Sequence, residues 1–258
     1  MTTISTSAQA APVRTDAGST AASRSRQDQH QLLGRLTGLM FIVTFATAIP
    51  PVVTFYVPAL TDPAFVLGGG FDTGVSWGAL LELLLIMANI VTALALYPVL
   101  KRRFPVLSLG FVAARLMEST FIAVGIVALM ALNTLRIQAG DSDPDALVAV
   151  GKSLVAVHDW TFRMGPGMVV GVGNGLILGA MMWKSRLVPR FLSVFGLIGG
   201  PALLVAGTAV LFGIIEAGSG WQVLATAPEF LWELSLGVWL LARGFNAAAL
   251  AALGARQA

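Results

Sequence analysis

The sequence contains no cysteine, only two histidines and few charged residues. Without cysteine, disulfides, thiolate chemistry and cysteine-based metal sites are excluded. The histidines, His30 and His158, lie far apart and do not provide the ligands of a zinc site, so we expect no metal and no cofactor. Charged residues make up 11% of the 258 residues and hydrophobic residues 56%, whereas about 25% of a soluble domain is charged. The composition therefore predicts a membrane protein.

The sequence also lacks the motifs of the common enzyme classes. It has no nucleotide-binding loop, no Gly-x-Ser-x-Gly elbow and no metalloprotease motif. The net charge is +3, but the basic residues form short clusters at the ends of apolar runs, where membrane topology explains them. We therefore expect the lipid bilayer, and no nucleic acid, as a partner.

Six apolar runs are long enough to cross a bilayer, which takes roughly 20 residues as a helix. They extend over Leu36 to Tyr56, Trp77 to Leu100, Val106 to Leu132, His158 to Trp183, Phe191 to Ile215 and Trp221 to Leu241. The predicted fold class is all-α, a polytopic membrane helix bundle with six transmembrane helices.

Basic residues mark one set of span ends as cytoplasmic, because Lys and Arg are retained on that side. These ends carry Arg14, Arg24, Arg26, Arg35, Lys101, Arg102, Arg103, Lys184, Arg186, Arg190, Arg243 and Arg256, whereas the opposite connections hold only Arg136 and Lys152. Six spans with both termini in the cytoplasm satisfy this pattern. We predict a disordered cytoplasmic tail over 1–33, a six-helix transmembrane domain over 34–246 and a short cytoplasmic segment over 247–258.

Two longer connections are expected on the outer side, over 57–76 and 133–157. The first contains Gly68-Gly69-Gly70, which is flexible turn material. The second contains Asp143-Pro144, a helix-start signal with an N-cap residue followed by proline in the first turn. A short outer helix is therefore predicted to lead into the fourth span.

The third span contains Arg115 and Glu118, three residues apart and thus on one face of a helix. An ionised group in hydrocarbon costs at least a few kcal/mol, so such residues are normally buried and paired. Further ionisable residues lie within or at the ends of other spans: Glu82, Asp159, Arg163, Glu229 and Glu233. We interpret these seven residues as one candidate polar site inside the membrane.

Depth along the helices places Arg115, Glu118 and Glu233 near the middle of the membrane and the other four residues in its outer half. Glu229 and Glu233 share a face, and two carboxylates so close in a low dielectric resist being ionised together unless an arginine lies between them. Arg115 is the first choice for that arginine, and Arg163 is the expected partner of Glu82. A purely structural set of ion pairs that fixes helix register is the alternative interpretation.

The fourth span contains Gly167, Gly171, Gly175 and Gly179, which recur every four residues. Small residues at this spacing allow another helix backbone to approach closely. The repetition is a strong signal for helix packing and a weak one for chemistry. Asn89, in a polar stripe of the second span, is expected to form hydrogen bonds between helices.

Five segments in order resemble an uncharacterised bacterial integral-membrane family, a domain of unknown function similar to DUF4386. They are Gly34–Gly38, Ala95–Arg102, Ala114–Glu118, Lys184–Arg190 and Glu233–Phe245, and the similarity covers roughly residues 32 to 246. The resemblance implies a multi-pass protein of the bacterial cytoplasmic (inner) membrane. It implies no activity and no catalytic residues.

Three functions are compatible with these residues. The first is a membrane protein that binds or moves a small polar or cationic solute, with Glu118, Glu229 and Glu233 exchanging protons, Arg115 balancing them, and Glu82 with Arg163 as an outer gate. The second is a sensor or assembly module, with a structural charge network and a glycine row that pairs with a homo-oligomer or membrane partner. The third is an intramembrane lipid-modifying enzyme with paired glutamates as acid and base.

Overall fold

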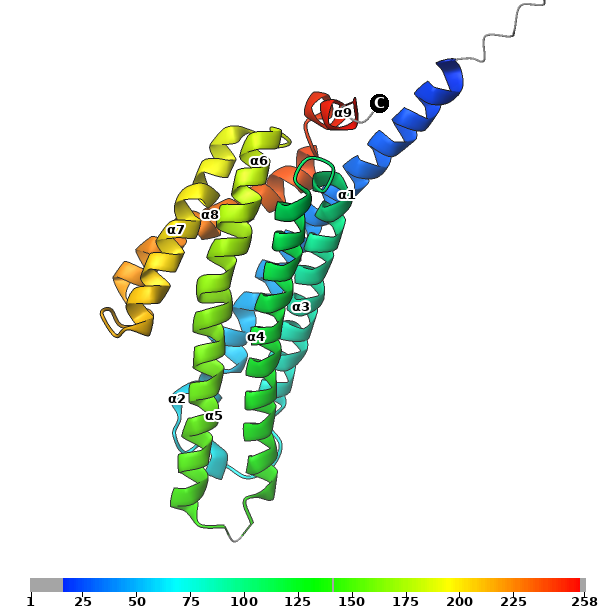
Figure 1. Ribbon diagram of the computed structural model, residues 1–258. Helices are drawn as coiled ribbons and strands as arrows, with labels where there is room; N and C mark the ends of the chain where they lie inside the picture. Colours follow the sequence, from blue (N-terminus) through cyan, green and yellow to red (C-terminus); the bar gives the residue numbers. More distant parts are fainter. Residues whose placement is uncertain (1–15, 141, 256–258) are drawn as a thin grey trace, which may run out of the picture.

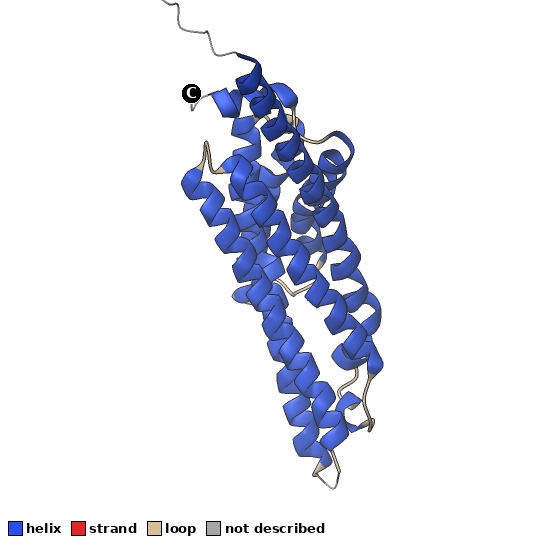
Figure 2. Cartoon of the chain, turned by 90° about the vertical axis from the view of Figure 1, so that its right-hand side faces the viewer, coloured by secondary structure: helices blue, strands red, loops and turns tan. Residues whose placement is uncertain are grey.

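The computed structural model describes residues 16–140 and 142–255, and every regular element within these ranges is helical (Figures 1 and 2). This confirms the predicted all-α class. The elements are α1 (Asp16–Pro50), η1 (Pro51–Phe55), α2 (Val57–Thr61), η2 (Phe65–Leu67), α3 (Thr73–Leu100), α4 (Pro105–Gln138), α5 (Pro144–Met164), η3 (Gly165–Val169), η4 (Gly171–Leu178), α6 (Gly179–Ser185), α7 (Arg190–Leu211), α8 (Gly220–Arg243) and α9 (Ala247–Ala255).

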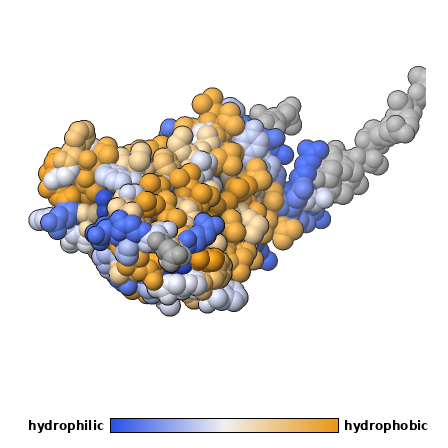
Figure 3. Space-filling model, turned by 90° about the horizontal axis from the view of Figure 1, so that it is seen from below, coloured by the Kyte–Doolittle hydropathy of each residue, from blue (hydrophilic) through white to orange (hydrophobic). Residues whose placement is uncertain are grey.

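Five helical stretches are long and apolar enough to cross a membrane, namely Arg24–Phe55, Thr73–Leu100, Pro105–Gln138, Pro144–Ser185 and Arg190–Leu211. α8 and α9 add a sixth when they are taken together as one span with a bend of 92°. Apolar side chains dominate the face of the molecule in Figure 3, where hydrophilic patches interrupt them. The predicted polytopic membrane bundle is confirmed, with five or six spans.

The long helices form a closed ring in the order of the chain. α1 packs against α3, α3 against α4, and α4 against α5, η3 and η4. η4 then packs against α7, α7 against α8, and α8 returns to α1. Side chains that point inward from different helices therefore meet at the centre of the ring, although they lie far apart in the sequence.

The helices differ in length, and α4 and α5 project beyond the α7–α8 hairpin (Figure 1). α4 has 34 residues, about 51 Å at 1.5 Å per residue, and α7 has 22 residues, about 33 Å. Only the shorter length matches a hydrocarbon core of about 30 Å. The projecting part has its own hydrophobic core, in which Tyr56, Phe65 and Val66 of the α1–α3 connection pack with Leu129 and Leu132 of α4.

Two elements differ from the sequence-based prediction. α1 begins at Asp16, so a helix covers the second half of the segment expected to be disordered over 1–33; residues 1–15 lie outside the described residues. Gln31 anchors this part of α1, because its side chain accepts from the Phe245 amide at 2.9 Å and donates to the Phe245 carbonyl at 2.8 Å. The predicted short outer helix does begin at Pro144, but it continues as one helical stretch to Ser185.

Candidate functional site

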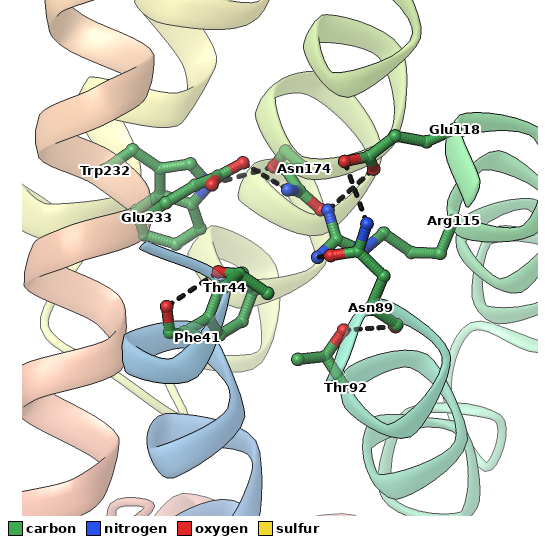
Figure 4. Close-up of polar contacts among 9 residues, drawn as sticks. All are labelled: Phe41, Thr44, Asn89, Thr92, Arg115, Glu118, Asn174, Trp232 and Glu233. Atoms are coloured by element: carbon green, nitrogen blue, oxygen red, sulfur yellow. Dashed lines mark hydrogen bonds and ion pairs between the residues drawn. The ribbon is translucent and has the colours of Figure 1, made fainter. Parts of the chain in front are cut away.

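A closed set of three polar side chains occupies the centre of the ring (Figure 4). Arg115 of α4, 2% exposed, donates from Nη1 to Oε2 of Glu118 at 2.8 Å and from Nη2 to Oδ1 of Asn89 of α3. The amide of Asn89 donates in turn to Oε1 of Glu118 at 3.1 Å. Each of the three side chains therefore bonds both others, and the ion pair forms without any carboxylate of α8. The Nε of Arg115 has no hydrogen-bond partner among the described residues.

A second group connects η4 to α8 (Figure 4). The Asn174 side-chain amide donates to Oε1 of Glu233, and the indole Nε1 of Trp232 donates to the Asn174 backbone carbonyl at 2.9 Å. Asn174 lies in a π-helical stretch, a wide-turn geometry that recurs at functional sites. The wide turn thus binds two consecutive residues of α8 through one asparagine.

Glu229 differs from the other buried carboxylates. It is 2% exposed, and neither of its carboxylate oxygens has a hydrogen-bond partner among the described residues. Two glycines make room for it, because a Cβ atom at Gly175 or Gly199 would lie 2.7 or 2.8 Å from its Oε2. Buried polar groups are almost always paired, and an unpaired carboxylate is costly.

A cavity of about 170 Å³ lies in front of these carboxylates. Its titratable lining residues are Arg115, Glu118, Glu229 and Glu233. One arginine against three glutamates leaves a formal charge of −2 when all are ionised. We call this space the inner cavity; it attracts cations or protons.

A larger cavity of about 880 Å³, the outer cavity, adjoins the inner cavity. Most of its lining is apolar, and its ionisable groups are His158, Asp159 and Arg163. Arg163 Nη2 lies 3.6 Å from Oδ2 of Asp159, so the two charges balance. Five residues line both cavities: Phe162, Pro166, Leu203, Thr226 and Phe230. The two spaces therefore adjoin, and these five side chains border both of them.

Glu82 lines neither cavity and belongs to a third polar group. The hydroxyl of Tyr56 donates to Oε2 of Glu82 at 2.9 Å, and the His158 ring packs edge-on against the Tyr56 ring at 5.5 Å. The structure thus pairs Glu82 with a tyrosine instead of the expected Arg163, which bonds Asp159 on its own helix. The phenol hydroxyl reaches Glu82 because α1 ends at Pro50 and η1 brings Tyr56 alongside α3.

The structure divides the seven predicted site residues into three places. The inner cavity brings together Arg115, Glu118, Glu229 and Glu233. Within the described residues, the hydrogen bonds of Arg115 go to Glu118 and Asn89, and none goes to the two glutamates of α8. The outer cavity holds Asp159 and Arg163, and Glu82 lies apart. Asn89 forms the interhelical hydrogen bonds expected of it.

Sequence reasoning missed the roles of Tyr56, Asn174 and Trp232. Asn174 was visible as an amide inside an apolar run, a position where a polar side chain needs a partner. Tyr56 is one of only two tyrosines in the chain, but its contact with Glu82 depends on how η1 turns. No local signal distinguishes Trp232 from Trp239, which lies in the same apolar run.

The glycine row of the fourth span packs within the chain. A Cβ atom at Gly171 would lie 2.8 Å from the Gly200 carbonyl of α7, and one at Gly175 would collide with the Gly200 backbone. A Cβ atom at Gly179 would lie 3.4 Å from the Leu197 amide nitrogen of the same helix. At Gly167 it is the carbonyl oxygen that approaches α7, 3.1 Å from a Cβ atom placed at Gly207. This close approach of η4 and α7 forms the wall behind Glu229.

Comparison with known proteins identifies a family. The model of a family described as a domain of unknown function, DUF4386, matches residues 36–244. No curated protein and no solved structure matches the chain. The match covers most of the 258 residues, from the first predicted span to the last. The protein is therefore a multi-pass membrane protein that belongs to the DUF4386 family.

Proposed function

We propose that this membrane protein binds or moves a small polar or cationic solute and exchanges protons at the inner cavity. Glu229 carries the proposal, because its buried carboxylate faces a cavity and has no partner among the described residues. Glu118 and Glu233 raise the negative charge around it, and Arg115 balances only one of the three carboxylates. A proton or a bound cation would compensate the remaining charge.

The fluorescence of Trp232 provides a test without knowledge of the solute. Its indole bonds Asn174, which bonds Glu233, so a change of charge at Glu233 alters the environment of the ring. The chain has six tryptophans, and a variant that keeps only Trp232 isolates this signal. In lipid nanodiscs we expect a sigmoidal change of its emission with pH, shifted by methylammonium and lost in Glu233→Gln.

A variant that keeps only Trp183 is the matched control. This ring stacks with the guanidinium of Arg190 at 5.0 Å and does not line the inner cavity. Its emission should stay constant. A Trp232 signal that responds neither to pH nor to methylammonium would count against the proposal.

A structural module is the second candidate function, and the set of Asn89, Arg115 and Glu118 favours it. Their hydrogen bonds are mutual and hold α3 against α4, as expected of a group that fixes helix register. The glycine row gives this candidate less support, because α7 of the same chain already covers Gly171 and Gly175. Stability of charge-removal variants separates the two functions, as discussed below.

A further inference from the structure

We propose that the ligand of this site is an amphiphilic amine, a cationic head joined to an apolar body. This inference rests on the proposed function and specifies the class of solute. The head would lie in the inner cavity beside Glu229, and the apolar body would occupy the outer cavity. Three observations lead to this class: the excess negative charge lies in one cavity only, the two cavities share lining residues, and the cavities differ in size.

The charge is confined to the inner cavity. There three carboxylates face one arginine, and neither oxygen of Glu229 has a hydrogen-bond partner in the part of the chain that the structure describes. In the outer cavity Asp159 and Arg163 balance each other at 3.6 Å. A cation therefore has one favourable place in the combined space, and that place is the inner cavity.

The outer cavity suits an apolar body. It is about five times as large as the inner cavity, 880 against 170 Å³, and Leu203, Val223, Phe230 and Leu231 contribute to its lining. This space is open, since Phe230 is 44% and Leu231 47% exposed, so it is accessible from the apolar surface of the bundle. An apolar chain or ring makes contact with such a lining, and a small hydrated cation does not. The volumes therefore favour a ligand larger than the cation that the inner cavity holds.

Aromatic rings lie where the two spaces meet. Phe162 and Phe230 line both cavities, and Phe45 of the inner cavity packs edge-on against Phe230 at 5.0 Å. Aromatic faces attract ammonium groups and pack equally well against apolar groups. These rings can therefore contact both the cationic head and the apolar body of one ligand, at the point where the two are joined.

The test uses three probes with the protein in nanodiscs: phenylhexylamine, its neutral counterpart phenylhexanol, and methylammonium. Equilibrium dialysis, with empty nanodiscs subtracted, gives the affinity of each. We expect the amine to bind about tenfold or more tightly than either of the others, because only the amine uses both cavities. In Glu229→Gln the amine should lose its advantage over the alcohol.

Two matched replacements of alanine by phenylalanine test where the apolar body binds. Ala227 lines the outer cavity, so Ala227→Phe should fill that space and lower the affinity for phenylhexylamine about tenfold. Ala46→Phe adds the same ring to an exposed position of α1 that lines neither cavity, and should leave the affinity unchanged. Both variants keep Glu229.

Each of three results would overturn the inference, and they have different consequences for the proposed cation site. Equal affinity of phenylhexanol and phenylhexylamine would show an apolar pocket, of the kind a lipid chain fills, that does not recognise charge. Methylammonium binding as tightly as phenylhexylamine, with no effect of Ala227→Phe, would leave the proposed cation site intact and remove the apolar body. Absence of any cation binding, together with a Trp232 signal insensitive to pH, would overturn both proposals.

Discussion

Arg115 and Glu118 form a 2.8 Å ion pair one helical turn apart, and Asn89 of the neighbouring helix closes it with hydrogen bonds to both. Removing one partner of a buried pair costs about 3–5 kcal/mol, since the other charge stays buried and unpaired, whereas removing both is often nearly neutral. We expect Arg115→Gln and Glu118→Gln to lose most of their folded, monodisperse yield in mild detergent, and the double variant to recover it. Single variants as stable as the wild type would show that the pair is not structural.

Removal of the Glu229 carboxylate should have the opposite effect on stability. Glu229 has no hydrogen-bond partner among the described residues, so Glu229→Met, which keeps the length and removes the charge, should keep or raise stability. An unsatisfied buried polar group costs about 1–3 kcal/mol, and this is the expected gain. Thermal unfolding in detergent measures it, with Glu118→Gln as the destabilised comparison. A marked loss of stability in Glu229→Met would mean that the carboxylate has a partner that holds the bundle together.

The close approach of η4 and α7 leads to a third prediction. A Cβ atom at Gly175 would meet both the Gly200 backbone and the Glu229 carboxylate, so Gly175→Ala should lower the folded yield and leave the oligomeric state unchanged. Gly220→Ala is the control, because nothing lies within 4 Å of a Cβ atom at that position. Size-exclusion chromatography measures both properties. A changed oligomeric state with normal yield would instead place Gly175 at an interface between chains.

The absence of cysteine allows the orientation to be tested without background labelling. We propose that both termini are cytoplasmic, so Ser142 in the α4–α5 connection faces outward and Ala247 after α8 faces inward. In intact cells a membrane-impermeant maleimide should label Ser142→Cys, and should label Ala247→Cys only after permeabilisation. Both positions are exposed and uncharged, so the topogenic basic residues stay in place. The reverse labelling pattern would invert the proposed orientation.

The sequence was sufficient for the class of fold, because spans are identified by the length and continuity of apolar runs. It was less informative where a helix continues through polar residues. Nothing local distinguishes a disordered Ser- and Gln-rich tail from the helix that starts at Asp16, and what anchors that helix, the bond of Gln31 to Phe245, joins residues more than two hundred positions apart.

For the site, the sequence was sufficient to select the residues but not to predict which of them pair. Rarity of charge in apolar runs was enough to select Arg115, Glu118, Glu229 and Glu233, all of which line one cavity. Which of them pair depends on the rotation of each helix about its axis, and that rotation is set by packing at positions such as Gly175 and Gly200. Pairing of Arg115 with Asn89, and of Glu82 with Tyr56, was therefore beyond what spacing along the chain can predict.

The length of α4 and α5 also matters for how the protein can be imaged. Detergent or lipid covers the ring of spans and hides the helices that cross it, which makes small membrane proteins difficult to align in electron micrographs. The end of the α4–α5 hairpin, with its own hydrophobic core, projects past the α7–α8 hairpin (Figure 1). With 34 residues α4 is longer than a bilayer core requires, so this end is expected to extend past the micelle. An antibody fragment raised against the exposed position Ser142 would add mass there.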